Sequence, residues 1–195
     1  MDSKKITIIQ GHPDPATDHL AHALAQAYTK GAEAGRHTVR QIVVAHLDFP
    51  LLRRKVDWDT GTLPPGLQEA TNAIGGADHL VIIFPLWLGT MPAMLKGFLE
   101  QVLRPGFAFE RQTGGTGWKP ALKGKSARVI VTMGMPALFY RWFYGANGVR
   151  GFERNILGFC GISPIRETLL GLVDGKPARR ESWLRQCEKL GRRGQ

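Results

Sequence analysis

Residues 11–20, GHPDPATDHL, gather hydrogen-bonding side chains where an apolar run passes into a helical pattern. The Thr17 hydroxyl and the Asp18 amide can face a phosphate, and His12 and His19 can donate hydrogen bonds to its oxygens. The free N–H groups and the dipole of a helix that begins here favour an anion. The alternative is an ordinary N-cap by Thr17 or Asp18 with both histidines at the surface, and the loop by itself favours that alternative.

Several familiar catalytic motifs are absent. The chain has no G-x-G-x-x-G, and GKS at 124–126 is not a phosphate loop because position 119 is Lys and a strand pattern follows. It also has no G-x-S-x-G and no H-E-x-x-H, so neither a hydrolase nor a zinc enzyme has support. Cys160 and Cys187 form no CxxC, and we expect two buried thiols and no metal site.

The elements that would position residues 11–20 follow an alternating pattern. Apolar runs predict strands over 4–10, 38–47, 79–85, 127–134 and 163–173. Helical spacing predicts helices from Leu20 to Gly31 or Gly35 and over about 66–74, 91–103, 155–161 and 178–195. This alternation predicts a single α/β domain over residues 1–195 with a doubly wound sheet. Such sheets bind ligands at the carboxyl ends of their strands, which is where residues 11–20 begin.

The segment FPLWLGTMPAMLKGFLEQVLRPGFAFE, residues 84–110, starts at the end of the third predicted strand. Together with GHPDPAT it resembles the flavodoxin-like NAD(P)H dehydrogenase (quinone) family, which includes quinone reductases and flavoprotein subunits of potassium efflux systems. The resemblance covers about residues 4–175. It implies a flavodoxin-like five-stranded parallel sheet in the order 2-1-3-4-5, with helices on both faces.

The resemblance also implies how a flavin, FMN or FAD, would be held. His12, Thr17, Asp18 and His19 would bind the phosphate, and the segment Pro85, Leu86, Trp87 and Leu88 would flank the ring. A flat ring with a hydrogen-bonding edge needs backbone groups along that edge and apolar walls. Trp87 could instead be a core aromatic, but its place after a strand favours the flavin. Asp18 departs from the family pattern, and we expect its amide to face the phosphate and its carboxylate to point away.

The fourth predicted strand ends in TMGMPALFY, residues 132–140, where the family has a Thr-Thr-Gly-Gly type loop followed by Tyr. Thr132, Gly134 and Tyr140 match this pattern, whereas methionines replace the second Thr and the second Gly, which predicts a more apolar pocket. The family also places a His nearby, but the chain has none after residue 79. We therefore expect Tyr140 and Tyr144 to be catalytic, with Tyr140 donating a hydrogen bond to reduced flavin or acceptor. Other groups that could meet the negative charge are Arg141, Asn147 and Arg150.

The segment 138–144, LFYRWFY, is rich in aromatic residues. It could line a flat acceptor site or cover a subunit interface, and both roles stay open. The resemblance implies a homodimer with its active sites at the interface.

Net charge and hydropathy limit the cellular location and the classes of partner that we expect for this protein. The net charge of +10 could indicate nucleic acid. Much of it lies in residues 178–195, where Trp183, Leu184, Cys187 and Leu190 instead predict an amphipathic helix with a basic solvated face. We expect no nucleic-acid partner. No window is apolar enough for a membrane span and no secretory segment is evident, so we expect a cytoplasmic protein.

The sequence therefore predicts a flavin-dependent oxidoreductase that carries hydride from NAD(P)H to a quinone or similar acceptor. Both substrates would use one site in turn, which predicts ping-pong kinetics. Two alternatives are a flavodoxin-type electron carrier and a regulatory flavoprotein subunit of a membrane transporter. The basic charge, the aromatic segment and the loop 106–118 oppose the carrier, whereas nothing in the sequence opposes the transporter subunit.

Overall fold

The fold centres on a five-stranded, fully parallel sheet in the order β2-β1-β3-β6-β7. The computed structural model describes residues 2–112 and 117–195, so part of the loop 106–118 lies outside it. The strands are β1 (Lys5–Gln10), β2 (Thr38–Val43), β3 (His79–Pro85), β6 (Ser126–Met133) and β7 (Ile165–Gly171). Counted along this sheet alone, the order is the predicted 2-1-3-4-5, and the flavodoxin-like fold class is confirmed.

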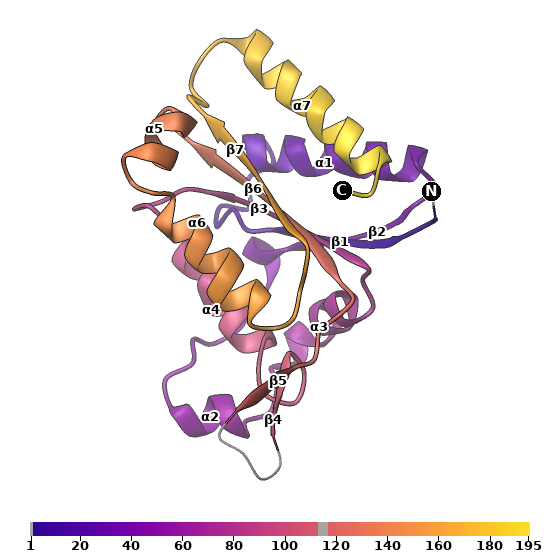
Figure 1. Cartoon of the computed structure of the whole chain (residues 1–195), viewed down its shortest axis with the longest axis vertical. Helices are drawn as coiled ribbons and strands as arrows, with labels where there is room; N and C mark the ends of the chain where they lie inside the picture. The colour runs from indigo at the N-terminus through magenta and orange to yellow at the C-terminus, as the bar shows by residue number, and fades with distance from the viewer. Residues whose placement is uncertain (1, 113–116) are drawn as a thin grey trace.

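Helices cover both faces of the sheet (Figure 1). The longer ones are α1 (Leu20–Ala34), α3 (Gln68–Gly75), α4 (Ala93–Val102) and α7 (Pro177–Arg192). One buried core lies between the sheet and the pair α1 and α7, and a larger one lies on the opposite face, where α3, α4 and the segment 147–158 pack. Alternate residues of β3 enter the two cores, because a parallel strand between two helical layers has no solvated face.

The two helices on the first face, α1 and α7, pack at close range because glycines lie between them. A Cβ atom on Gly31 would stand 1.9 Å from the Glu188 carbonyl oxygen, and one on Gly191 would stand 2.1 Å from that of Tyr28. Cys187 is buried in this contact, and Trp183 packs beside it. The amphipathic terminal helix predicted from the sequence is confirmed.

Short elements account for most differences from the predicted boundaries. The second strand ends at Val43, and a 3₁₀ turn, η1 (Val44–His46), replaces its predicted last residues. The predicted helix at 155–161 is the end of a π-helix, η3 (Phe152–Gly158), followed by a turn. Elements that the sequence pattern missed are η2 (Pro65–Leu67), α2 (Lys55–Asp59), α5 (Ala137–Trp142), α6 (Asn147–Gly151) and the strands β4 (Phe109–Arg111) and β5 (Trp118–Pro120).

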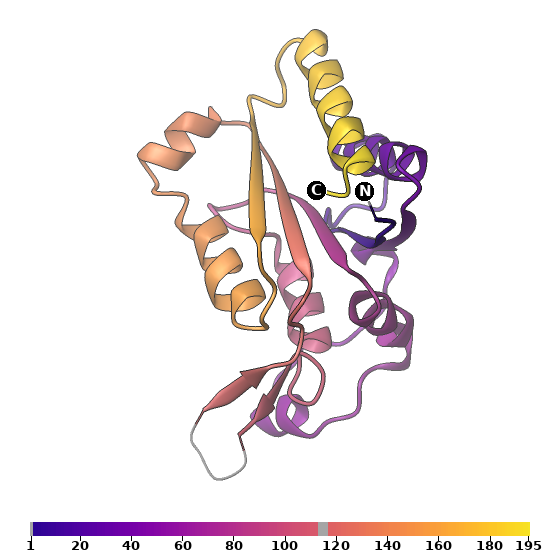
Figure 2. The same cartoon turned by 45° about the vertical axis from the view of Figure 1, so that its right-hand side comes forward.

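The strands β4 and β5 pair as an antiparallel hairpin that extends away from the main sheet (Figure 2). Its aromatic side chains pack together, with Phe109 5.2 Å from Trp118 and 5.6 Å from Trp58, measured between ring centroids. Trp58 comes from α2, so the hairpin and α2 support one another. Elements this short show no full period of apolar residues, which is why the sequence alone does not reveal them.

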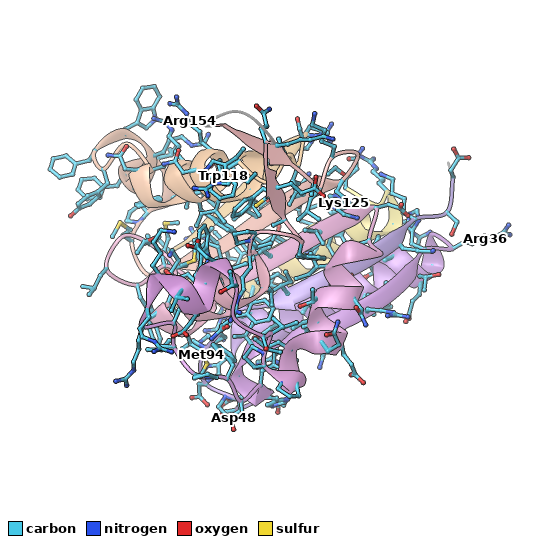
Figure 3. All side chains as sticks on the ribbon, turned by 90° about the horizontal axis from the view of Figure 1, so that it is seen from below. Arg36, Asp48, Met94, Trp118, Lys125 and Arg154 are labelled. Carbon is cyan, nitrogen blue, oxygen red and sulfur yellow. The ribbon has the colours of Figure 1, made fainter. Side chains whose placement is uncertain are left out.

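The loop after η1 packs on α4, and Figure 3 shows Asp48 of this loop and Met94 of α4 toward the same edge of the molecule. The Gln101 side-chain amide donates a hydrogen bond of 2.5 Å to the Pro50 carbonyl. A Cβ on Gly97 would lie 2.7 Å from the Leu51 side chain. These contacts fix α4, and with it the segment that leads into α4 from β3.

Cys160 and Cys187 are free and buried, as expected, and burial raises the pKa of their thiols to about 11 and about 12. Within residues 2–112 and 117–195 there is no group of three or more His, Cys, Asp and Glu side chains that could hold a metal ion. No helix in this part of the chain is long and apolar enough to cross a membrane.

The buried His79 at the start of β3 predicts a specific loss of stability in acid. Its side chain is 3% exposed, and burial, together with the positive charges of Lys4 and Arg128, lowers the pKa of His79 to about 4. In the unfolded chain the pKa is about 6.5. Unfolded protein therefore binds the extra proton between these values, so this stability is complete above about pH 6.5 and is lost as the pH falls toward 4.

We expect the wild type to lose about 2 kcal/mol more of its unfolding free energy than His79→Gln between pH 7 and pH 4.5. Glutamine does not titrate, and it can keep a hydrogen bond to Ser126, whose hydroxyl lies 2.8 Å from His79 Nδ1. Urea unfolding of both proteins at the two pH values measures the difference. Equal losses would show that His79 does not carry this proton linkage.

Candidate functional site at the carboxyl edge of the sheet

Three loops meet at the carboxyl ends of β1, β3 and β6. These strands are neighbours in the sheet, and in Figure 1 the β6 and β7 arrows point toward the end where α5 lies. The Gly11 amide donates to the Ile83 carbonyl at 2.7 Å, and the Leu86 amide donates to the Thr132 carbonyl at 2.7 Å. The structure therefore brings together the predicted segments that begin at residues 11, 85 and 132.

The first loop is organised by two stacked histidines. The rings of His12 and His19 lie 4.0 Å apart between centroids with an interplanar angle of 21°. Asp14 holds this pair, since its Oδ2 is 2.9 Å from His19 Nε2 and its Oδ1 accepts the Ala16 amide at 2.9 Å. Burial and the neighbouring His19 lower the pKa of His12, which favours the neutral form of its ring.

Free amides mark the start of α1. The N-cap is His19, with no side-chain capping bond, so the ordinary cap by Thr17 or Asp18 does not occur. Across the fully described stretch 11–23, the amides of residues 17–21 donate to no protein acceptor, and the side chains of Thr17 and Asp18 are exposed without a hydrogen-bond partner. Consecutive free N–H groups at a helix N-terminus form an anion site.

Gly11 has a different role from the one that its place in the loop suggests. The sequence predicts one anion-binding loop over residues 11–20, but a Cβ on Gly11 would lie 2.6 Å from a methyl carbon of Leu95. This glycine therefore lets α4 pack closely against the end of β1. The amides that face outward belong to residues farther along the loop.

The second loop is a tight turn that exposes two apolar side chains. Trp87 and Thr90 exchange backbone hydrogen bonds of 2.9 and 3.0 Å, and the residues between them have left-handed backbone, with φ of 47° at Leu88 and 81° at Gly89. Trp87 is 50% exposed and Leu88 is fully exposed. Trp87 is therefore not a core aromatic.

Trp87 also lies close to the first loop. Its ring is 6.1 Å from that of His12 in an edge-on arrangement. Pro85 and Leu86, which precede it, are half-buried, and Leu86 packs against the larger core. The free amides of residues 17–21, the stacked histidines and the apolar wall formed by Trp87 and Leu88 thus share one edge of the sheet.

The third loop follows β6. Thr132 is buried, with its carbonyl tied to Leu86, and Gly134 is exposed just beyond the strand. Met133 is buried and Met135 packs against the larger core, so both methionines contribute to that core.

The structure places the two predicted catalytic tyrosines differently. Tyr140 is 1% exposed, and its hydroxyl donates a hydrogen bond of 2.9 Å to the Gly89 carbonyl. Tyr144 is 48% exposed, with its ring 6.4 Å from that of Tyr140. The sequence predicts that the Tyr140 hydroxyl is directed at flavin or acceptor. In the structure this hydroxyl instead donates its single proton to the Gly89 carbonyl of the turn, which comes within reach only in the folded chain.

The structure also places differently the three other groups, Arg141, Asn147 and Arg150, that were candidates to meet the negative charge in place of a histidine. Arg141 forms an ion pair with Glu167 of β7. Arg150 is exposed. Asn147 lines a hollow of about 790 Å³ that runs between the 87–93 segment and the start of η3. Of the three, Asn147 is the group that the structure places beside Trp87 and Leu88.

This hollow includes residues that no sequence motif indicated: Lys96, Gly148, Gly151, Phe152, Asn155 and Ile156. They come from α4, α6 and η3. The helical spacing of α4 marks which residues are apolar, but no sequence pattern shows that η3 lies opposite them.

A family model for the flavodoxin-like fold matches residues 4–190. The chain belongs to this family. An uncharacterized NAD(P)H oxidoreductase of Haemophilus influenzae is 30% identical over 122 residues, covering 60% of this chain and 59% of the relative. An FMN-dependent NADH:quinone oxidoreductase of Ruegeria pomeroyi is 27% identical over 156 residues, covering 70% of this chain and 71% of the relative.

Among solved structures, the flavodoxin-like chain is similar to an NAD(P)H:quinone oxidoreductase from Methanothermobacter marburgensis. The TM-score is 0.77 with 22% sequence identity, and the match covers 98% of this chain and 96% of that one. At this identity the likeness supports the fold. The resemblance inferred from the two sequence motifs is confirmed by the family and by its named relatives.

Proposed function

We propose that this flavodoxin-like protein is an FMN-dependent oxidoreductase that transfers hydride from NAD(P)H to a quinone or a similar electrophilic acceptor. The observation that carries the proposal is the unpaired amide series at residues 17–21, beside the exposed Trp87–Leu88 wall. A mononucleotide needs an anion site and a flat apolar surface on one edge, and both are present. FMN is favoured over FAD because the relative from Ruegeria pomeroyi is named FMN-dependent.

The residues fit FMN in the following way. Thr17, the amides of residues 17–21 and the ring nitrogens of His12 and His19 would bind the phosphate. Trp87 and Leu88 would flank the ring, with Pro85, Leu86, Thr132 and Gly134 along its edge. Asp18 is exposed and can turn its carboxylate to solvent. Bound FMN would supply the hydride acceptance and delivery.

The protein groups would act mainly by binding and orientation. Holding the donor and acceptor atoms at about 3 to 3.5 Å removes much of the entropic barrier to transfer. The hollow beside Trp87 would exclude water on one side, and Asn147 can donate a hydrogen bond there. Since NAD(P)H and the acceptor would occupy the same place in turn, ping-pong kinetics are expected. The net charge of +10 attracts an anionic dinucleotide.

We further propose a homodimer that covers the exposed aromatic side chains of α5 and of the two residues that follow it. Phe139, Trp142, Phe143 and Tyr144 are 46, 82, 70 and 48% exposed. The rings of Phe139 and Phe143 stack at 4.9 Å between centroids. A contiguous exposed aromatic surface of this kind is typical of a protein interface.

The proposal is tested on protein purified without added flavin. The cofactor released by heat is identified by chromatography, and the oxidation of NADH and of NADPH is followed with a benzoquinone acceptor. We expect FMN and quinone-dependent oxidation, with sedimentation at twice the chain mass for the dimer. FMN without pyridine-nucleotide oxidation would indicate an electron carrier. Protein that neither contains nor binds FMN would overturn the proposal.

Trp87→Ala is expected to weaken FMN binding about tenfold while the fold persists. Stacking of a flat ring on an aromatic side chain contributes about 1 to 3 kcal/mol. The side chain is half exposed, so its removal leaves no buried cavity. Fluorescence titration of flavin-free protein measures the affinity, and Trp183→Ala in α7, on the opposite face, is the control. If both variants bind FMN as the wild type does, Trp87 does not form the wall.

A further inference from the structure

The buried Tyr140 hydroxyl lies where three segments meet. It donates a hydrogen bond of 2.9 Å to the Gly89 carbonyl. Gly148 packs so closely that a Cβ there would lie 2.0 Å from the Gly89 carbonyl oxygen. The hydroxyl therefore connects helix α5, which carries Tyr140, to the Trp87–Thr90 turn, and α6 packs against the same carbonyl through Gly148.

The Trp87–Thr90 turn requires such a connection, because its backbone is strained and its side chains do not anchor it. Leu88 has φ of 47°, a left-handed conformation that costs a branched side chain about 1 to 2 kcal/mol. Its side chain is fully exposed and gains nothing from packing. Such a conformation persists only where surrounding contacts determine it. These contacts are the Trp87–Thr90 backbone pair, the Leu86–Thr132 bond and the Tyr140–Gly89 bond.

We infer that Tyr140 is a positioning residue, whose hydroxyl holds the Trp87–Thr90 turn in the conformation that receives the flavin ring. This inference rests on the proposed function. Tyr140 acts through Gly89 and does not itself transfer a proton to flavin or acceptor. Its oxygen has one proton, which Gly89 accepts, and its side chain is 1% exposed. Loss of the hydroxyl leaves the Gly89 carbonyl without this partner and lowers the population of the binding-competent turn.

Three single variants separate positioning from chemistry. Tyr140→Phe removes the hydroxyl. Gly148→Ala displaces the Gly89 carbonyl but keeps the hydroxyl. Tyr28→Phe is the matched control, since Tyr28 is also fully buried and its hydroxyl also donates to a carbonyl, that of Gln195 at 3.0 Å, on the α1–α7 face. Circular dichroism and thermal unfolding establish that each variant folds.

We expect the FMN dissociation constant to rise about tenfold in Tyr140→Phe and at least as much in Gly148→Ala, and to stay at the wild-type value in Tyr28→Phe. The Tyr140→Phe/Gly148→Ala double variant should bind no more weakly than Gly148→Ala, because both changes disturb one contact. With FMN at saturation, the rates of flavin reduction and reoxidation in Tyr140→Phe should stay within about twofold of wild type.

Two results would overturn the inference. If Tyr140→Phe binds FMN normally but its reduction or reoxidation is slowed tenfold or more, the hydroxyl takes part in the chemistry and the inference is overturned. If Tyr28→Phe weakens FMN binding equally, the effect is only a general loss of stability, and the inference also fails. Should Tyr140→Phe not fold, Gly148→Ala decides by the same measurements. Wild-type protein that binds no FMN would instead refute the proposed function.

Discussion

Gly31→Val is expected to lower the free energy of unfolding by about 3 kcal/mol, near the upper end of the usual cost of overpacking. A Cβ at this position would stand 1.9 Å from the Glu188 carbonyl oxygen and 2.9 Å from its Cα. The obstacle is the backbone of another helix, so no rotamer change relieves it. The helices α1 and α7 must therefore separate, which exposes Cys187 and the apolar side chains packed around it.

Urea unfolding measures this loss, and Gly151→Ala is the matched control. Gly151 is also helical, but a Cβ there would meet nothing within 4 Å. The control should be neutral or stabilising by about 0.5 to 1 kcal/mol, because alanine favours the helix. Equal unfolding free energies for Gly31→Val and wild type would show that α7 does not lie as close to α1 as the structure places it.

Thr17→Ala is expected to weaken FMN binding by about 10- to 150-fold. A hydrogen bond from the hydroxyl to a phosphate is charge-assisted and contributes about 1.5 to 3 kcal/mol. The Thr17 side chain is exposed and has no protein partner, so its truncation should not disturb the fold. Fluorescence titration of flavin-free protein gives the affinity.

Thr60→Ala serves as the control for Thr17→Ala, since Thr60 is another exposed threonine and its hydroxyl donates only to Val56 in the same helical turn. It should bind FMN as the wild type does. Unchanged affinity in Thr17→Ala would place the phosphate elsewhere. The free amides at residues 17–21 would then have no assigned ligand.

The strands and the long helices could be predicted because the spacing of apolar residues within each element shows which of its faces is buried. The run 80–85 is apolar throughout, and β3 occupies these residues together with His79, as expected for a strand covered by helices on both sides. The helix predicted from Leu20 ends with Gly35 as its C-cap. Elements such as α2 and the β4–β5 hairpin were missed because their form depends on Trp58, Phe109 and Trp118 meeting across the chain.

The sequence by itself determined the fold class, the family and the loops that form the candidate site, because apolar periodicity and two local motifs are properties of adjacent residues. Only the tertiary structure decided that His12 stacks on His19, that Trp87 is exposed and that the Tyr140 hydroxyl bonds to Gly89. A hydroxyl takes whichever acceptor packing brings within reach. Tyr140 and Gly89 are 51 residues apart, and no local pattern records which distant carbonyl a buried tyrosine will face.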